Sequence, residues 1–384
     1  MHMKILFVAA NIPVPGVEAN DIIVTVARRL IDRGSEVHLV FPVEWIPLPR
    51  FLLGKKGRAL VGLADRFQLL GVPVTLWRYL RLPGTRFSFL FAGVRLGGGH
   101  WLFDPDVIHA HYVLPDGEIA RKIASSLGKR YVVTARQGDW RKLSRLSERS
   151  FLRRAALRVL RGAAAVFSPG KIVADRFADW GVEMQVLPHG VEALPAGIGI
   201  EPCEGPLVVS VAASLYRGKQ VDWVVKAVAA LKHTRSLELR IMGGGEEEAR
   251  LKSLLALLRV NARFMGHVPR TVVLENLRQS HIFALPSASE TFGLVYLEAA
   301  VSGCAVIATR GTGVDGLFVD GEEMRFQSGY YEDFLACLRN LVEEDTARIS
   351  LARHGRERVL KDYLWDTVLS RYEEMYAKVA ALRP

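Results

Sequence analysis

Short apolar runs rich in β-branched residues alternate with amphipathic helical stretches along the chain. The apolar runs lack the strict alternation of a half-exposed strand, which is typical of parallel strands buried on both faces. In the first half they are KILFVAA, EVHLVFP, VTLWRYL, DVIHAHY, YVVTAR, AAVFSPG and MQVLPHG; in the second they are LVVSVAA, LELRIMGGG, ARFMGHV, HIFALPS and CAVIATR. This order predicts an α/β protein with two Rossmann-like, doubly wound domains.

The chain length of 384 residues also favours two domains, because it exceeds what one hydrophobic core usually organises. Residues 193–206, ALPAGIGIEPCEGP, are rich in Pro and Gly and have no periodicity, so they are interpreted as the interdomain linker. The predicted domains are 1–192 and 207–362. The C-terminal helix, 363–384, is expected to pack back on the first domain.

Targeting signals are not evident in the sequence. No apolar run reaches the roughly 18 residues of a membrane-spanning helix, and the opening MKILFVAA is too short for a signal peptide. Cys203, Cys304 and Cys337 are widely spaced and match no metal or disulfide pattern, which fits a reducing compartment. These features predict a cytoplasmic protein.

The positive charge is concentrated in the first half of the chain. Residues 1–190 hold 28 Lys and Arg against 15 Asp and Glu, whereas the remainder holds 23 against 25. The stretches 45–67 and 136–161 are basic and amphipathic, which is typical of segments that rest on an anionic membrane. Helices packed on the sheet with solvated basic faces remain the alternative. Nucleic acid is not expected as a partner, because neither stretch lies in a known nucleic-acid-binding module.

Candidate site residues follow the strands, since ligands of doubly wound folds bind at the carboxyl ends of the strands. After HIFALPS comes a loop that contains Glu290, and a helix is expected to begin near Gly293. The free N–H groups of a helix N-terminus with a glycine approach favour phosphate binding.

Glu298 lies in this helix among apolar neighbours, in the run LVYLEAAV. A buried carboxylate costs several kcal/mol unless it is paired or hydrogen-bonded. The sequence therefore predicts that either a protein donor or a ligand meets this carboxylate.

Two further glycine- and lysine-containing loops follow strands of the second half. Lys219 precedes a helix start and could hold a diphosphate as a point charge, although an isolated lysine is more often a solvated surface residue. The glycine run at 243–245 opens an acidic helix, so a structural turn is at least as well supported as a phosphate loop. The run is also not the spaced dinucleotide fingerprint.

The stretch FDPDVIHAHYVLPDG offers a metal-site interpretation, because it contains an Asp-x-Asp pair, Asp104 and Asp106, and a His-x-His pair, His109 and His111. We prefer to interpret the two aspartates as a turn before a strand. His111, at the carboxyl end of that strand, is the better candidate for contact with a substrate.

The motif LPSASETFGLVYLEAAVSGCAVIAT resembles the paired-glutamate signature of retaining glycosyltransferases of family 4, with Glu290 and Glu298 as the pair. The resemblance extends over nearly the whole chain, through VVTARQGD, VLPHGVE and KQVDWVVKAV among other segments. It implies the GT-B fold, in which two Rossmann-like domains face each other across a cleft. The first half most resembles members that act in bacterial cell-surface polysaccharide synthesis.

The resemblance also implies roles for individual residues. Glu290 would hydrogen-bond the donor sugar, Glu298 would bind the ribose hydroxyls, and Lys219 would bind the diphosphate. The family's diphosphate-binding arginine is replaced here by Ser214, and its first glycine loop is reduced to Gly16. The backbone at the start of the helix would hold phosphate, His111 would lie near the sugar and Asp139 near the acceptor. That backbone segment comprises Thr291, Phe292, Gly293 and Leu294.

The expected function is metal-independent, retaining transfer of a hexose from a UDP- or GDP-sugar to a lipid-linked or anionic glycan. This activity would take place on the inner face of the cytoplasmic membrane, with the protein peripherally bound and without a cofactor. The alternatives are a catalytically silent GT-B scaffold that binds sugar nucleotides at the membrane, and a GT-B sugar-nucleotide epimerase.

Overall fold

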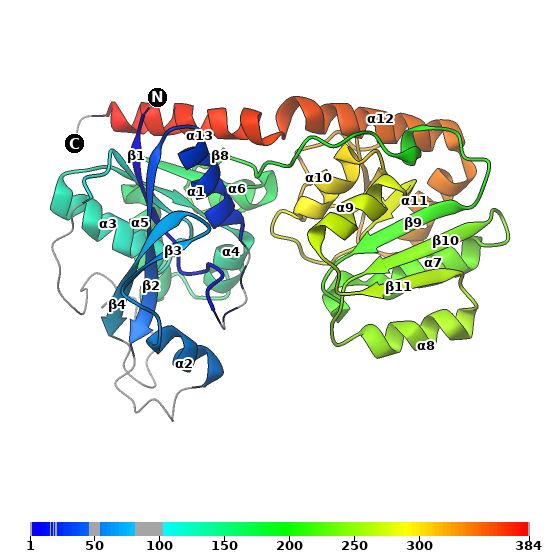
Figure 1. The fold of residues 1–384 in the computed structure, drawn as a ribbon, viewed down its shortest axis with the longest axis horizontal. Helices are drawn as coiled ribbons and strands as arrows, with labels where there is room; N and C mark the ends of the chain where they lie inside the picture. The colour runs from blue at the N-terminus through cyan, green and yellow to red at the C-terminus, as the bar shows by residue number, and fades with distance from the viewer. Residues whose placement is uncertain are drawn as a thin grey trace. The chain divides into compact units, whose positions relative to one another are not determined.

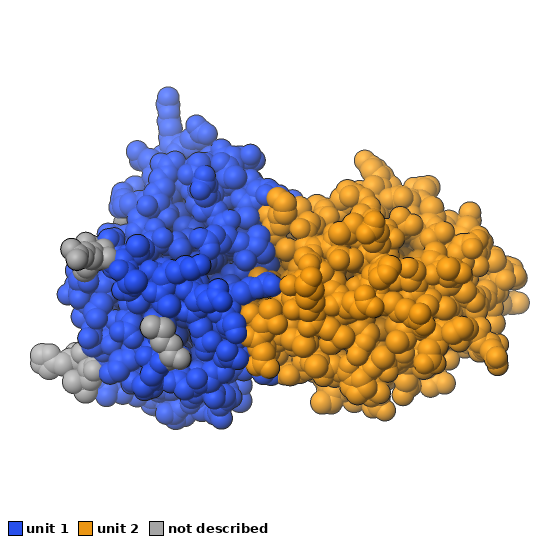
Figure 2. Space-filling model, turned by 90° about the horizontal axis from the view of Figure 1, so that it is seen from above, with its two compact units in different colours: residues 1–169, 173–187, 369–384 blue, residues 170–172, 188–368 orange. Residues whose placement is uncertain are grey.

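The computed structural model describes residues 2–15, 17, 19, 21–45, 54–80 and 103–382. The chain divides into two compact units (Figure 2). Unit 1 comprises residues 1–169, 173–187 and 369–384, and unit 2 comprises residues 170–172 and 188–368. Each unit contains its own sheet and hydrophobic core.

Unit 1, within its described residues, is built on an eight-stranded sheet in the order β3-β4-β2-β1-β5-β6-β7-β8. The strands are β1 (Lys4–Val8), β2 (Glu36–Trp45), β3 (Arg66–Leu69), β4 (Val72–Leu80), β5 (Val107–Ala110), β6 (Tyr131–Thr134), β7 (Ala165–Ser168) and β8 (Gln185–Val186). Only the β3–β4 pair of this sheet is antiparallel. Since β1 lies between β2 and β5, the strand order reverses there, which is where such sheets bind ligands.

Helices cover this sheet (Figure 1). They are α1 (Ile22–Asp32), α2 (Lys55–Val61), α3 (Asp116–Leu127), α4 (Gln137–Leu143), α5 (Phe151–Gly162), α6 (Lys171–Ala178) and the end of α13 (Trp365–Ala380). The helices are amphipathic: α5, for example, buries Val159 and Leu160 and exposes Arg154 and Arg158. Among the described residues, no helix has the length and apolar character needed to cross a membrane.

Unit 2 is built on a six-stranded parallel sheet in the order β11-β10-β9-β12-β13-β14. The strands are β9 (Leu207–Ala212), β10 (Leu237–Met242), β11 (Ala262–Gly266), β12 (Ile282–Ala284), β13 (Ala305–Thr309) and β14 (Arg325–Gln327). The helices are α7 (Val221–Leu231), α8 (Glu248–Leu258), α9 (Arg270–Arg278), α10 (Leu294–Val301), α11 (Tyr331–Glu343), α12 (Asp345–Asp362) and two 3-10 turns, η3 (Ile198–Ile200) and η4 (Arg217–Lys219). The strand order reverses between β9 and β12.

The central strands of both sheets are buried on both faces, and this confirms the predicted pair of parallel-sheet α/β domains. Every residue of β5, β6, β9, β12 and β13 is buried. The strands β3 and β14 were not predicted. Both are short, and β3 alternates between exposed and half-buried residues, so neither carries the continuous apolar signal of a central strand.

The segment 193–206, interpreted from sequence as a linker, belongs to unit 2 in the structure, and the unit boundary falls between Leu187 and Pro188. The Gly197 N–H donates to the Ser302 carbonyl at 2.9 Å, and a Cβ at Gly197 would lie 2.1 Å from the Arg278 carbonyl oxygen. Glycine allows this close backbone approach. The composition of the segment therefore reflects tight packing without periodic structure.

Candidate active site

The reversal of strand order between β9 and β12 locates the candidate site of unit 2, since the carboxyl ends of these strands diverge there. The loop after β9 leads through Ser214 to η4, and the loop after β12 carries Glu290 to the start of α10. The two loops are joined by the Ala288 N–H, which donates to the Gly218 carbonyl at 2.9 Å. Residues 70 positions apart in sequence are thereby held together.

The start of α10 is shaped by Gly293. Its φ of +80° is a left-handed conformation that favours glycine, and a Cβ there would lie 2.5 Å from the ring of Tyr296. Phe292 is buried and its ring makes an edge contact with that of His189, 5.2 Å between centroids, while Thr291 is exposed. These contacts fix the approach to the helix, whose first backbone N–H groups lack helical acceptors.

Lys219 and Glu290 form an ion pair in this loop cluster. Their side chains are 13% and 12% exposed, so the pair is largely shielded from water yet still accessible. The backbone of Glu290 is held as well, because its carbonyl accepts the Gly313 N–H at 3.2 Å. A cation and a carboxylate are thus presented together beside the start of α10, where a phosphate and a hydroxyl group can be bound at once.

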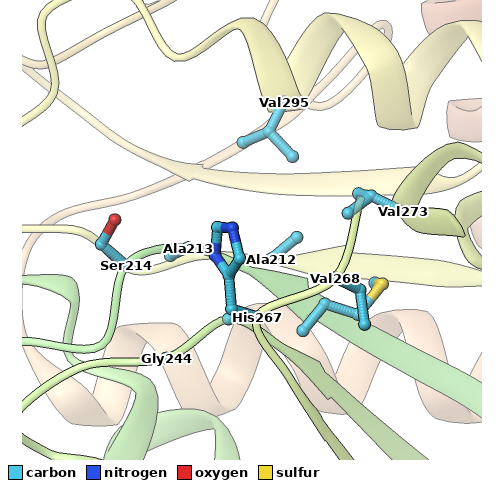
Figure 3. A pocket seen from close by; sticks show the side chains of 10 residues that line it. Ala212, Ala213, Ser214, Gly244, His267, Val268, Val273 and Val295 are labelled. Atoms are coloured by element: carbon cyan, nitrogen blue, oxygen red, sulfur yellow. The ribbon is translucent and has the colours of Figure 1, made fainter. Parts of the chain in front are cut away.

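A cavity of about 250 Å³ lies beside the loop after β9. Figure 3 shows His267 and Val295 pointing into the cavity from opposite sides, with Ser214 on its wall. Ser214 offers a neutral hydroxyl where the family that the sequence resembles has an arginine. The nearby Arg217 has an 86% exposed side chain that pairs with Glu247 at 3.7 Å.

The glycine run Gly243–Gly245 makes a tight turn, and its first two residues line the cavity. A Cβ at Gly243 would lie 1.8 Å from the Ala213 carbonyl oxygen, and one at Gly245 would lie 2.3 Å from the Leu215 carbonyl oxygen. Both glycines also have positive φ angles. The structural interpretation of the run therefore holds for Gly243 and Gly245, while Gly243 and Gly244 also form part of the cavity wall.

Glu298, a carboxylate among apolar neighbours, has a partner within the protein. The Glu298 side chain is 10% exposed, and its Oε1 lies 2.5 Å from Nη2 of Arg270, the first residue of α9. Of the two partners expected from sequence, a protein donor is therefore present, and the ribose role of Glu298 stays a prediction.

In unit 1, His111 follows β5 at the reversal between β1 and β5. It is 2% exposed and its ring stacks on that of His109, 4.2 Å between centroids. His109 is in turn hydrogen-bonded to the Tyr376 hydroxyl at 2.7 Å and the Thr134 hydroxyl at 2.8 Å. Burial, with a smaller contribution from the charge of Arg136, lowers the pKa of His109 to about 3, so this ring is neutral.

Asp139 is also buried in unit 1, at 7% exposure. Its carboxylate accepts the N–H of Arg136 at 2.9 Å and that of Val113 at 3.3 Å, and it caps the start of α4. Burial raises the pKa of Asp139 to about 6. Both oxygens thus already bind backbone, and contact of Asp139 with an acceptor stays a prediction.

The sequence-predicted residues outside these two clusters are accounted for as follows. Asp104 pairs with Lys129 at 3.0 Å, and Asp106 accepts the N–H of Lys4 at 2.8 Å, so both have structural partners. Among the described residues, no group of three His, Cys, Asp or Glu side chains could hold a metal. Gly16 lies outside the described residues.

Comparison with protein families matches both halves of the chain. Residues 19–190 match the model described as "Glycosyl transferase 4-like domain", and residues 200–358 match "Glycosyl transferases group 1". The two models together cover most of the chain, and the chain belongs to the glycosyltransferases that they describe. The family resemblance seen in the sequence is thereby confirmed.

Curated relatives of this glycosyltransferase match over part of their length. It is 27% identical over 199 residues to glycogen synthase of Mycobacterium tuberculosis, covering 50% of this chain and 48% of that protein. It is 27% identical over 220 residues to the lipopolysaccharide core biosynthesis glycosyltransferase LpsE of Rhizobium meliloti, covering 55% and 62%. The match therefore spans about half to three fifths of these relatives.

Solved structures match the glycosyltransferase over its full length. Sucrose-phosphate synthase from Thermosynechococcus elongatus has a TM-score of 0.75 at 17% identity, covering 99% of this chain and 100% of that one. Anabaena Alr3699/HepE in complex with UDP and glucose has a TM-score of 0.66 at 16% identity, covering 98% and 100%. At these identities the comparison establishes the GT-B fold.

Two residues of the glycosyltransferase were missed by the sequence argument. Arg270 is the first residue of a helix that has no distinctive sequence motif. The sequence indicated only that Glu298 needs a hydrogen-bond donor, without identifying Arg270 as that donor. Asp116 is fully buried in the first turn of α3 and accepts the Ala10 N–H at 3.1 Å. Burial raises its pKa well above the usual range. An acidic residue at a helix start is so common that its burial could not be anticipated.

Proposed function

We propose that the chain transfers a hexose, with retention of configuration and without a metal, from a nucleoside diphosphate sugar to a lipid-linked glycan acceptor of the cell envelope. The observation that carries this proposal is the Lys219–Glu290 ion pair beside the start of α10. A shielded cation and helix N–H groups suit a departing diphosphate, and a carboxylate beside them suits the hydroxyl groups of a sugar. Family membership supports the same chemistry.

In the proposed reaction, charge develops on the leaving diphosphate and on the sugar as the bond between them breaks. Lys219 and the backbone N–H groups of residues 291–294 stabilise the diphosphate. Glu290 orients the sugar and Glu298 binds the ribose. His111, which is buried and stacked on a neutral His109, is proposed to contact the sugar.

The donor is proposed to be a UDP-sugar, with a GDP-sugar as the alternative. The structure of HepE was determined with UDP, which supports uridine. The replacement of arginine by Ser214 removes one charged phosphate contact, worth about 1.5–3 kcal/mol. We therefore expect weaker diphosphate binding than in a family member with that arginine.

The acceptor is proposed to be presented at an anionic membrane surface on the cytoplasmic side. The name of LpsE, which acts in lipopolysaccharide core synthesis, supports a lipid-linked acceptor. Exposed basic residues on α4, on α5 and between them support the membrane contact. They are Arg141, Lys142, Arg145, Arg149, Arg154 and Arg158. Of the other predicted contact segment, 45–67, residues 46–53 lie outside the described residues.

Liposome co-sedimentation tests the membrane proposal. Each basic residue near an anionic surface contributes about 1 kcal/mol, so replacing four of them with glutamine should release the protein from acidic vesicles. The test variant replaces Arg141, Arg145, Arg154 and Arg158. A matched control replaces four exposed cations of unit 2: Lys226, Lys252, Arg339 and Lys361. Equal release by both variants, or equal pelleting with neutral lipid, would contradict the proposal and leave an acidic glycan as the anionic partner.

Sugar transfer itself is tested in two steps. A thermal-shift screen with UDP, GDP, ADP and CMP identifies the nucleotide, because a ligand that binds only the folded state raises its stability. Turnover of the corresponding labelled sugar nucleotide is then measured with extracted lipid acceptor, and product anomeric configuration is determined by NMR. Nucleotide binding without turnover against any lipid fraction would instead favour a silent GT-B scaffold, which the loss of the arginine at Ser214 independently suggests. Interconversion of the sugar nucleotide without an acceptor would indicate an epimerase.

A further inference from the structure

The ion pair between Arg270 and Glu298 joins the first residue of α9 to the middle of α10. Arg270 is poorly placed for its own helix. The N-terminus of a helix carries partial positive charge and favours acidic residues, and the first turn of α9 contains none. The Arg270 side chain is 49% exposed, so it is free of the packing constraints that hold a core residue. We therefore interpret the Arg270 guanidinium as the partner of the buried Glu298 carboxylate.

The ion pair borders the cavity of unit 2. Val273 lies one helical turn after Arg270, and Val295 lies one turn before Glu298. Both valines line the cavity, on opposite helices (Figure 3). Since residues three apart share a helix face, the guanidinium and the carboxylate lie on the faces of α9 and α10 that turn toward the cavity.

We propose that Arg270 is a positioning residue for nucleotide recognition, holding the Glu298 carboxylate in the orientation that accepts the ribose 2′- and 3′-hydroxyls. This inference rests on the proposed function. An ionised carboxylate offers about four acceptor sites on its two oxygens, and the guanidinium is paired with Oε1. The guanidinium is charged at every accessible pH.

The charge of Arg270 also matters for the diphosphate. A lone carboxylate at the ribose would repel the phosphates of the same ligand, whereas an arginine–glutamate pair has no net charge. This compensation is more important here than in a site with two phosphate-binding cations, because Ser214 provides none.

A purely structural ion pair would make a different prediction. It would stabilise the packing of α9 against α10, and its loss would weaken binding of every nucleotide equally. A positioning residue instead affects the part of the ligand that Glu298 recognises. The ratio of affinities for a ribonucleotide and its 2′-deoxy analogue separates the two, because the analogue lacks one of the hydroxyls.

The experiment measures binding of UDP and 2′-deoxy-UDP by isothermal titration calorimetry, with GDP and 2′-deoxy-GDP used if UDP does not bind. The proteins are wild type, Arg270→Met, Arg270→Lys, Glu298→Gln and the Arg270→Met/Glu298→Gln double variant. Arg263→Met is the matched control, because Arg263 forms an arginine–glutamate pair with Glu238 at 3.1 Å at the opposite, amino ends of β10 and β11. Melting temperatures are recorded for all six proteins.

Wild type should prefer the ribonucleotide by about tenfold, the effect of one hydrogen bond to a charged group. Arg270→Met should reduce this preference to about threefold or less, Arg270→Lys should retain part of it, and Arg263→Met should leave it unchanged. The double variant should match Glu298→Gln. An unchanged preference in Arg270→Met, or equal weakening of both ligands, would overturn the inference while leaving the proposed function intact. Failure of wild type to bind either ribonucleotide would instead overturn both.

Discussion

Acidification provides a direct test of the buried histidine in unit 1. His109 has a pKa of about 3 in the folded chain and 6.5 as its ordinary value, because the buried ring cannot be charged without losing its solvation. Between these two pH values, His109 is therefore protonated in the unfolded chain and neutral in the folded chain. For a lowered histidine pKa, stability is fully present above pH 6.5 and is lost as the pH falls toward 3.

The magnitude follows from the two pKa values. One pKa unit corresponds to about 1.4 kcal/mol, so titration of His109 alone should remove about 2 kcal/mol of stability between pH 7 and pH 5, and about 4 kcal/mol once the pH reaches 3. Among the described residues, the groups around the ring include Tyr372, Tyr376, Thr134, His111, Phe7, Phe167 and Arg136. None of them supplies a negative charge that would offset this loss.

The assay is native-state hydrogen exchange of the β5 amides at pH 7 and pH 5, in wild type and in His109→Gln. Glutamine retains hydrogen-bonding capacity toward Thr134 and Tyr376 but does not titrate. Because the substitution itself changes the absolute stability, the quantity compared is the change in stability between the two pH values. Wild type should lose about 2 kcal/mol more than the variant.

Unit 2 supplies the internal control for this comparison. Burial, with the nearby charges of Arg348 and Arg235, lowers the pKa of His281 to about 4, so unit 2 should also lose stability with acid. That loss should be identical in wild type and His109→Gln. An equal pH dependence of β5 in the two proteins would refute the assignment of His109 as a buried neutral ring.

Three further outcomes are expected. Glu290→Gln should reduce sugar transfer by about a hundredfold or more with an unchanged circular dichroism spectrum, and activity within a few-fold of wild type would remove Glu290 from the mechanism. Gly243→Ala should lower the stability of unit 2 by at least about 1–3 kcal/mol in thermal melts, because its Cβ would lie 1.8 Å from a carbonyl oxygen. The adjacent Gly244→Ala, with no atom nearer than 3.7 Å, is the control and should be nearly neutral. Transfer should survive EDTA, and a loss that Mg²⁺ or Mn²⁺ restores would disprove metal independence.

The fold class could be predicted from the sequence because a central strand that is covered on both faces must be apolar along its whole length. Such a run of consecutive apolar residues can be recognised without knowledge of the tertiary structure. The same holds for the start of α10, where Gly293 precedes an apolar helix, and for the need of Glu298 for a partner. The edge strands β3 and β14 were not predicted, because an edge strand is less completely covered and need not be apolar along its whole length.

The identity of each partner depended on tertiary structure. Glu298 and Arg270 are brought together by the packing of α10 against α9, and His109 meets Tyr376 across 267 positions of sequence. A sequence shows that a buried polar group needs a hydrogen bond, since its neighbours along the chain reveal its burial. Which donor satisfies it is decided by which elements the sheet order places side by side, and many orders are compatible with one pattern of apolar runs. The sequence alone therefore predicted the two sheets and the need of buried polar groups for partners. Only the tertiary structure showed that Arg270 is the partner of Glu298 and that Tyr376 is a partner of His109.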